Sequence, residues 1–530
     1  MTRQRSSILI CTLVATISVS AQTVRSNAYA RMLDDAGGLL TAERWEDAAK
    51  VYRRLEIMDS TSAEVAYGLG VCLGHIPGQR TAATERFARA SRYGHLEAKY
   101  QLALVLHRQQ RFDEALALLA YYKSAAEHEV PDAEVDRQVR MVATARELQA
   151  DPVQVNIANM GPRINSKDND YSPVTTADGA TLYFTSRRKG STGEARDPSG
   201  QYLEDIYMAR KEGGEWGSAM NVGVPLNTFV HDATVGLSPD GGSMIIYRTA
   251  QNLVSGDLYE CVKHLGAWEP PTKMTERINS SSHEPSATIA PDGSEIYFTS
   301  DRPGGMGGRD IYRIRKLPGG EWSLPLNLGP VINTPFDEDA PFMHSDGKTL
   351  FFSSNGHATM GGYDIFKSTL TDPDMNGWTA PENMGHPLNT VNDDIFFCLS
   401  EDGRTGYFSS ARADGLGGQD IYSIVFPESQ LEEIVVRGVV TDGMEEPVQA
   451  RIVLTGEADG EMVGVYNTNA RTGRYLMVVK PGERYNMTVE APGFVPRSDA
   501  LSTVGKSGGL TEIPLDIILV RDEKTARVKP

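Results

Sequence analysis

The chain has 530 residues, 40% of them hydrophobic, with 51 glycines and 28 prolines, so several globular domains are expected. Its formal net charge at pH 7 is −18. This acidic excess argues against binding to nucleic acid or to anionic lipid surfaces and does not indicate a fold.

The start of the chain has the pattern of a secretory signal peptide over residues 1–21. Arg3 and Arg5 precede an apolar run over residues 8–19, and small residues lead to a cleavage site after Ala21. The run is too short to span a bilayer, and no later run is longer, so no transmembrane segment is expected.

Three cysteines follow the signal peptide: Cys72, Cys261 and Cys398. They are scattered and odd in number, so they do not form a paired disulfide framework. We expect three buried thiols that act as small apolar residues, and no structural disulfide.

Residues 27–150 have a helical pattern. The stretches 44–52 and 111–119 repeat one element, in which an aromatic residue and an acid pair precede a helix of small residues. Gly68 and Gly70 lie where helices must approach closely. The pattern resembles tetratricopeptide repeats, which implies stacked helical hairpins with a concave face for a partner protein. A plain helical spacer is the alternative.

Residues 153–426 contain one motif written five times. Each copy has an Asp-Gly turn, an aromatic strand, a glycine-rich loop and an Asp-Ile-Tyr-like triplet, and most copies continue into a strand with tryptophan. Such four-stranded units at a fixed period predict the blades of a β-propeller. The turns begin at Asp178, Asp240, Asp292, Asp346 and Asp402.

The two ends of this repeat array predict how the ring closes. The fifth copy stops after Tyr422 without its last strand, whereas residues 159–165 align with residues 327–333 of the third copy. The first strand of the array therefore completes the last blade, which removes an open sheet edge. We expect five blades. Six is the alternative, if a degenerate blade lies near residues 426–435.

Residues 434–520 show short strands with regular turn signals, which predict a small antiparallel β-sandwich. The pattern resembles the carboxypeptidase regulatory-like domain, and residues 521–530 form a charged tail. The predicted fold is thus multidomain, with an α-helical repeat followed by all-β domains.

The repeat motif, best seen over residues 291–312, resembles the TolB-type, WD-like propeller. The domain order is similar to that of Bacteroidetes envelope proteins, namely the peptidoglycan-associated component of the type IX secretion system and its OmpA-family relatives. This resemblance implies a periplasmic protein associated with the outer membrane, with envelope or secretion proteins as partners. Those relatives end in an OmpA-like domain, whereas ten residues follow Val520 here, so direct peptidoglycan binding is not expected.

An acid stands eight residues before each Asp-Gly turn. A shared structural role in each blade is one interpretation. The other is a carboxylate ring at the channel mouth that binds a cation, a sugar or a basic partner residue, and whose like charges would raise each other's pKa. The candidate binding residues, called the ring acids below, are Asp170, Asp232, Glu284, Glu338 and Asp394.

A second recurring acid precedes each Ile-Tyr-like pair and is interpreted as a strand-end cap. The histidines show no metal-ligand spacing, and no cofactor is expected; whether the ring acids bind a metal stays open. Because the acids repeat with the blades, we expect a non-enzymatic scaffold that binds proteins. The alternative is a carbohydrate-active or peptide-hydrolysing propeller enzyme, which needs two carboxylates in different environments. The second set comprises Asp205, Asp257, Asp310, Asp364 and Asp420.

Overall fold

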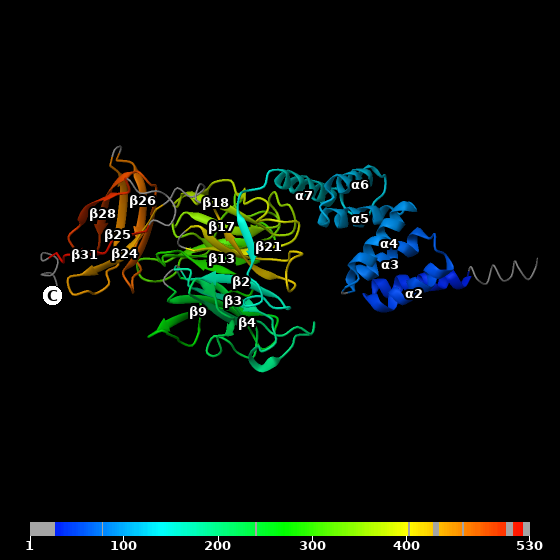
Figure 1. Ribbon diagram of the computed structural model, residues 1–530, viewed down its shortest axis with the longest axis horizontal. Helices are drawn as coiled ribbons and strands as arrows, with labels where there is room; N and C mark the ends of the chain where they lie inside the picture. Colours follow the sequence, from blue (N-terminus) through cyan, green and yellow to red (C-terminus); the bar gives the residue numbers. More distant parts are fainter. Residues whose placement is uncertain are drawn as a thin grey trace, which may run out of the picture. The chain divides into compact units, whose positions relative to one another are not determined.

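The computed structural model describes residues 27–76, 78–176, 178–238, 241–400, 403–427, 434–457, 460–504 and 512–522. Helices make up its N-terminal part and β-sheets, mostly antiparallel, the rest, which confirms the expected combination of α and β parts (Figure 1). The predicted signal peptide lies outside the described residues. Among the helices that are described, none is long and apolar enough to cross a membrane.

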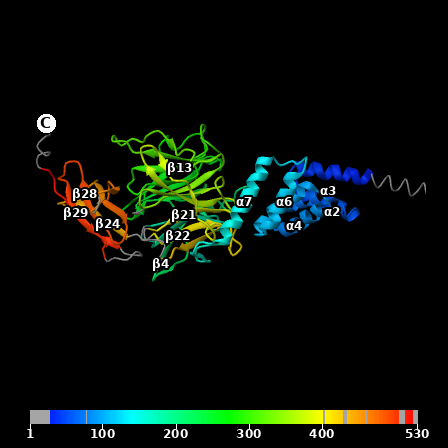
Figure 2. The same cartoon turned by 90° about the horizontal axis from the view of Figure 1, so that it is seen from above.

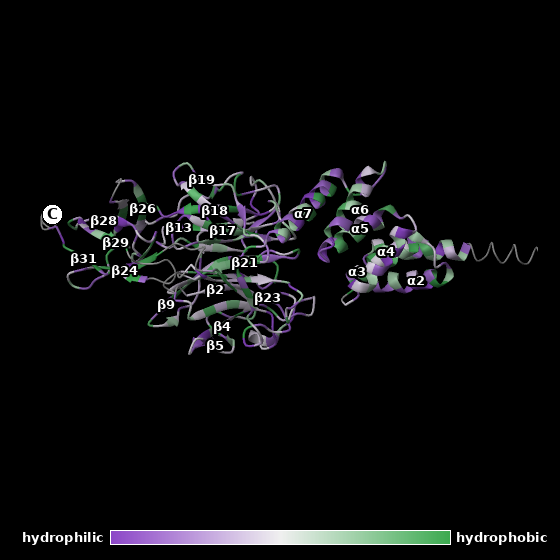
Figure 3. Ribbon diagram, turned by 45° about the horizontal axis from the view of Figure 1, so that its top comes forward, coloured by the Kyte–Doolittle hydropathy of each residue, from purple (hydrophilic) through white to green (hydrophobic). Residues whose placement is uncertain are grey.

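The chain divides into two compact units, residues 1–146 and 147–530. In the first, residues 27–41 are helical, and each later helix packs on the next up to α6 (Figure 2). Polar and apolar residues alternate around these helices (Figure 3). The later helices are α2 (Trp45–Met58), α3 (Ala63–His75), α4 (Arg80–Arg92), α5 (Leu96–Arg108), α6 (Phe112–Ser124) and α7 (Asp132–Ala150), which runs into the second unit.

The glycines of α3 let neighbouring helices approach, as predicted. A Cβ atom at Gly68 would lie 2.3 Å from the Tyr52 ring, and one at Gly70 would lie 2.8 Å from the Phe87 ring. Side chains at these positions would therefore push α3 away from its neighbours.

Five antiparallel sheets follow. The first contains β2 (Asp170–Thr175), β3 (Thr181–Ser186), β4 (Asp205–Glu212), β5 (Glu215–Trp216) and β6 (Met220–Asn221). The second contains β7 (Asp232–Leu237), β8 (Ser243–Thr249), β9 (Gly256–His264), β10 (Ala267–Trp268) and β11 (Thr272–Lys273). The third contains β12 (Ala287–Ile289), β13 (Glu295–Ser300), β14 (Asp310–Arg315) and β15 (Leu326–Asn327).

The fourth sheet contains β16 (Glu338–Met343), β17 (Thr349–Ser354), β18 (Asp364–Asp372), β19 (Gly377–Trp378) and β20 (Glu382–Asn383). The fifth contains β21 (Asp394–Leu399), β22 (Thr405–Ser410), β23 (Asp420–Val425) and the early strand β1 (Asn156–Asn159). The first strands of the sheets contact one another in a closed cycle, in the order β2, β7, β12, β16, β21 and back to β2. We call this assembly the five-sheet ring.

The predicted closure of the ring is confirmed. β1 pairs antiparallel with β23, and Asn156 lies opposite Val425 while Asn159 lies opposite Tyr422. The start of the array thus supplies the outer strand of the fifth sheet, which would otherwise leave β23 as an open edge.

Two further sheets, called the sandwich below, share one hydrophobic core. One sheet contains β26 (Met462–Asn467), β25 (Arg451–Gly456), β28 (Arg484–Glu490) and β29 (Arg497–Ser502) in that order. In the other, β24 (Ile434–Asp442) pairs antiparallel with β27 (Arg474–Val479) but parallel with β30 (Glu512–Pro514) and β31 (Ile517–Leu519). The expectation of a purely antiparallel sandwich is therefore wrong for this sheet, because the end of the chain returns beside β24 in the same direction.

The cysteines are free and buried, as expected. Burial raises the pKa of Cys72 to about 11 and the pKa values of Cys261 and Cys398 to about 12. These thiols therefore stay protonated and unreactive near neutral pH.

Candidate functional site

The ring acids do not form a carboxylate ring that is open to the channel. All five have an exposed fraction of 0%, and four of them are the first residue of their strand, as Asp170 is of β2. Their side chains bind groups within their own repeat. The predicted binding ring is therefore wrong, because these carboxylates have no surface for a ligand to reach.

Each ring acid accepts a hydrogen bond from the backbone N–H four residues earlier, at 2.5 to 3.2 Å. These N–H donors belong to Ser166, Thr228, Ser280, Thr334 and Thr390. In four repeats an arginine also pairs with the carboxylate at 2.5 to 3.3 Å. These arginines are Arg188, Arg248, Arg302 and Arg412. The acids thus tie the entrance of each inner strand to the preceding loop and to the strand beside it.

The fourth sheet departs from this pattern. Gly356 stands where the other repeats have the arginine, and Glu338 accepts hydrogen bonds from Thr334 and from Ser354 Oγ at 2.7 Å. Burial raises the pKa of Glu338 to about 6. Burial also raises the pKa values of Asp232 and Asp394, although an arginine opposes it in both.

The second set of acids acts as strand-end caps, as predicted. Asp310, for example, accepts the N–H groups of Met306 at 2.5 Å and Gly307 at 3.1 Å from the glycine-rich loop, and the Asn327 side chain at 2.7 Å. Asp257 differs, because Lys273 takes the place of the asparagine, at 2.8 Å.

A recurring asparagine joins each sheet to the loop that follows it, and the sequence analysis missed its role. Asn333 accepts the N–H of Ile311 at 2.8 Å and donates to its carbonyl at 3.0 Å. The same pair of bonds is made in every repeat. The sequence contained a sign of this role, because the aligned segments 159–165 and 327–333 both end in asparagine, Asn165 and Asn333. The equivalent residues are Asn165, Asn227, Asn279, Asn333 and Asn389.

A small cavity lies between the inner strands of the ring. Inner-strand residues of all five sheets surround a cavity of about 40 Å³. Tyr171 stacks on Phe396 there, with ring centroids 6.0 Å apart, and Ser172 donates to Thr234 O at 2.6 Å. A volume of this size has room for a few water molecules and is far smaller than a ligand pocket of several hundred Å³.

Two carboxylates of the ring do not follow the repeat. Glu204 accepts a hydrogen bond from the Tyr171 hydroxyl, and its other oxygen lies 3.1 Å from His231 Nδ1. Burial opposes ionisation, but these two contacts lower the pKa of Glu204. The group links the first sheet to the second.

Asp339 is the other such carboxylate. Arg309 Nη1 donates to it at 2.5 Å, and Ser286 donates to its second oxygen. Arg309 also donates to the Tyr363 hydroxyl at 2.8 Å. The exposed fraction of the Asp339 side chain is 5%. The sequence marks Asp339 as exceptional, because the other repeats have no acid at this position. The equivalent residues are Tyr171, Ala233, Pro285 and Ile395.

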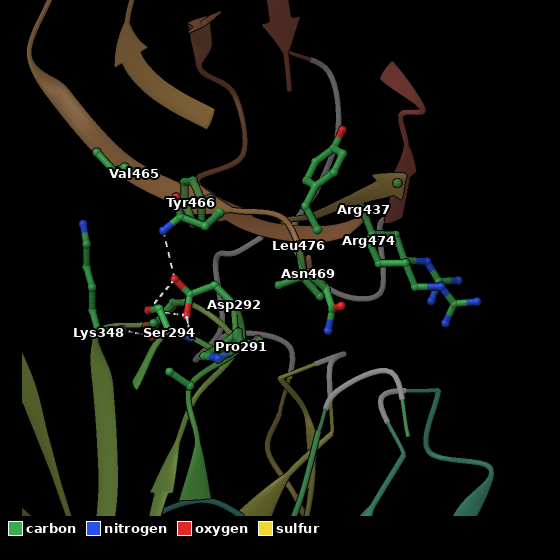
Figure 4. A pocket seen from close by; sticks show the side chains of 18 of the residues that line it. Pro291, Asp292, Ser294, Lys348, Arg437, Val465, Tyr466, Asn469, Arg474 and Leu476 are labelled. Atoms are coloured by element: carbon green, nitrogen blue, oxygen red, sulfur yellow. Dashed lines mark hydrogen bonds between the residues drawn. The ribbon is translucent and has the colours of Figure 1, made fainter. Parts of the chain in front are cut away.

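A larger cavity, of about 1010 Å³, lies in the second unit (Figure 4). Its walls are Asp-Gly turns of the ring, including Asp178 and Asp292, and strands β24, β26 and β27 of the sandwich. Asn467 donates to Asp292 Oδ2 at 2.9 Å across it. Within the described residues, no group of three or more His, Cys, Asp or Glu side chains is placed to hold a metal ion.

No family model matches the chain, and no curated protein matches it. An α-L-arabinofuranosidase from Lactobacillus brevis is 15% identical, with a TM-score of 0.32 over 51% of this chain and 94% of that one. An α-L-arabinanase from Penicillium chrysogenum is 12% identical, with a TM-score of 0.31 over 52% and 98%.

A 3-chlorocatechol 1,2-dioxygenase from Rhodococcus opacus is 12% identical, with a TM-score of 0.14 over 17% of this chain and 61% of that one. The chain thus spans about three fifths of the length of that dioxygenase. At these values the similarities assign neither a family nor an activity to this chain.

Proposed function

We propose that this protein is a non-enzymatic scaffold that binds other proteins in the cell envelope. The observation that carries the proposal is the burial of the ring acids and their hydrogen bonding within the ring. The ring acids are buried and hydrogen-bonded within their repeats, and the cavity lined by inner-strand residues of all five sheets measures about 40 Å³. This cavity is too small for a substrate, which supports binding at the outer surfaces of the ring.

The finer assignment is part of this proposal. We assign the five-sheet ring as a five-bladed β-propeller of the TolB type, the helical part as tetratricopeptide-like repeats and the sandwich as a carboxypeptidase regulatory-like domain. The sheet order and the pairing of β1 with β23 support the first of these. The sequence pattern of residues 1–21 supports export, and the domain order supports a periplasmic place at the outer membrane in a secretion or other envelope assembly.

The enzyme alternative rests on Glu204 and Asp339, the two carboxylates that break the repeat. Glu204 contacts Tyr171 and His231. Asp339 contacts Arg309 and Ser286. A glycosidase needs a protonated acid and a free carboxylate that flank the substrate, whereas Asp339 is ion-paired and almost fully buried. The geometry therefore favours the scaffold.

A hydrolysis assay tests this choice. The purified full chain is incubated with arabinan oligosaccharides and with unstructured peptides, beside the variants Glu204→Gln and Asp339→Asn. We expect no turnover by any of the three proteins. Hydrolysis by the parent chain that both variants lose would overturn the scaffold and support the enzyme.

A further inference from the structure

The 1010 Å³ cavity is bounded by a sheet edge that no strand of the described chain pairs with. β26 comes first in its sheet and pairs only with β25. Residues 463–467 of β26 line the cavity, and Figure 4 shows Val465 and Tyr466 on this wall. An unpaired edge strand is a template for pairing with another extended chain.

The backbone groups of β26 that face away from β25 follow from the ladder. Thr468 donates its N–H to Ala450 O at 2.9 Å, on the β25 side. Successive residues of a strand direct their backbone groups to opposite sides. The N–H and C=O groups of Val465 and Asn467 therefore point away from β25. They are free to form the hydrogen bonds of an added strand.

Two hydrogen bonds join the ring to the ends of this stretch. Lys348 Nζ donates to Val463 O at 3.0 Å, and Asn467 Nδ2 donates to Asp292 Oδ2 at 2.9 Å. The first contact occupies the backbone carbonyl of Val463, and the second uses the Asn467 side chain. The backbone of Val465 lies between them, where β26 lines the cavity.

The ring wall opposite β26 carries more acidic than basic side chains. Four carboxylates and one lysine, Lys348, line the cavity on this side, and Arg437 and Arg474 line it on the sandwich side (Figure 4). Side chains alternate along a strand, so every second side chain of a peptide added to β26 would face this wall. Lysine or arginine at those positions would complement it. The carboxylates that line the cavity on this side belong to Asp178, Asp292, Glu295 and Asp346.

We propose that the cavity binds an extended basic segment of a partner protein by β-strand addition to β26. The backbone of Val465 and Asn467 pairs with the segment, and the ring carboxylates take its lysine or arginine side chains. This inference rests on the proposed scaffold function, because it names the chemistry of one partner.

A proline at Val465 tests the backbone contact. Proline has no N–H, and on an edge strand it is tolerated where that N–H points outwards. Val465→Pro therefore removes the donor to the added strand and keeps the ladder with β25. Val465→Ala is the matched control, since it shortens the side chain and keeps the N–H. Asp178→Asn is a second variant, which removes one wall charge; because Asp178 also attracts Arg437 of β24, its melting temperature is measured beside that of the parent chain.

The probe is an N-acetylated, C-amidated peptide of four Thr-Lys repeats, compared with one of four Thr-Glu repeats. Fluorescence anisotropy measures affinity, and hydrogen exchange with mass spectrometry measures protection of residues 463–467 in the full chain. We expect the lysine peptide to bind the parent chain and Val465→Ala and to slow exchange in β26. Val465→Pro should weaken binding at least tenfold, and Asp178→Asn about threefold. The glutamate peptide should not bind.

Three results would overturn the inference. They are no binding of the lysine peptide at millimolar concentration, equal binding by Val465→Pro, and binding without slower exchange in β26. If Val465→Pro lowers the melting temperature, its weaker binding has no clear cause. The inference is then tested by the affinity of Asp178→Asn and by the protection of residues 463–467 in the parent chain. Each of these failures leaves the scaffold itself standing, because the hydrolysis assay tests that function with other residues.

Discussion

Glu338 offers the sharpest test of how the ring acids are held, because the other four have an arginine partner and it does not. Burial raises its pKa from 4.5 to about 6. A shift of about 1.5 units corresponds to about 2 kcal/mol. The ionised carboxylate of Glu338 therefore opposes folding by about that much near neutral pH.

The direction in which stability changes with pH follows from proton linkage. The folded-state pKa lies above the unfolded value, so the folded chain binds the proton more tightly between pH 4.5 and 6. The stability from protonated Glu338 is complete below pH 4.5 and is lost as the pH rises through 6. Glu338→Gln keeps a neutral acceptor for the N–H of Thr334 and removes this loss. We expect the variant to match the parent at pH 4.5 and to exceed it by about 2 kcal/mol at pH 7.5.

Asp170→Asn is the control with an arginine partner. It leaves Arg188, 2.5 Å away and mostly buried, without its counter-charge, so we expect a loss of about 3 kcal/mol at pH 7.5. Urea unfolding followed by tryptophan fluorescence at pH 4.5 and 7.5 measures both variants, since four of the five tryptophans lie within residues 153–426. Equal losses for the two variants at pH 7.5 would refute the reasoning.

Three further predictions concern export, closure and the asparagine contacts. Mass spectrometry of the native protein should show an N-terminus at Gln22, and an intact Met1 would contradict export. Deleting β1, Asn156–Asn159, should lower the melting temperature of the ring, because β23 becomes an unpaired edge; an unchanged value would contradict closure. Asn333→Ala should cost about 2 kcal/mol in urea unfolding, because it leaves the buried N–H of Ile311 unpaired, whereas Ile311 O keeps its bond from the Leu328 N–H; the exposed-loop change Asn252→Ala should cost less than about 0.5 kcal/mol.

The ring could be predicted from sequence because its signals are local and occur five times. Asp-Gly turns and alternating strands specify each sheet within about 50 residues. The match of residues 159–165 with residues 327–333 then placed β1 beside β23, as found. Each local pattern is weak alone, but its fivefold repetition allowed the order of the strands to be predicted.

The direction of the ring acids was not predicted, although the signal was present. A serine or threonine stands four residues before each of them, at Ser166 and its equivalents, and an arginine follows 16 or 18 residues later in four repeats. These are the donors that a buried carboxylate needs. Counting the acids alone identified equivalent positions but not which way their side chains point.

The contacts of Glu204 and Asp339 could not be predicted, because they join residues of different sheets. Tyr171 meets Glu204, and Ser286 meets Asp339, only when the ring closes. The open edge of β26 is likewise a property of the folded sheets, since the sequence shows a strand but not its neighbours. Both features depend on tertiary contacts that no repeat encodes.

Photo-crosslinking in the native envelope tests the scaffold most directly. A benzophenone amino acid is placed at Tyr121 of α6, whose exposed fraction is 57%, and at Phe229 of the ring, whose exposed fraction is 77%. Buried Tyr122 serves as the control position. The scaffold predicts discrete adducts with envelope proteins from at least one exposed position and none from Tyr122. No protein adduct from either exposed position, in cells that contain the folded chain, would contradict it.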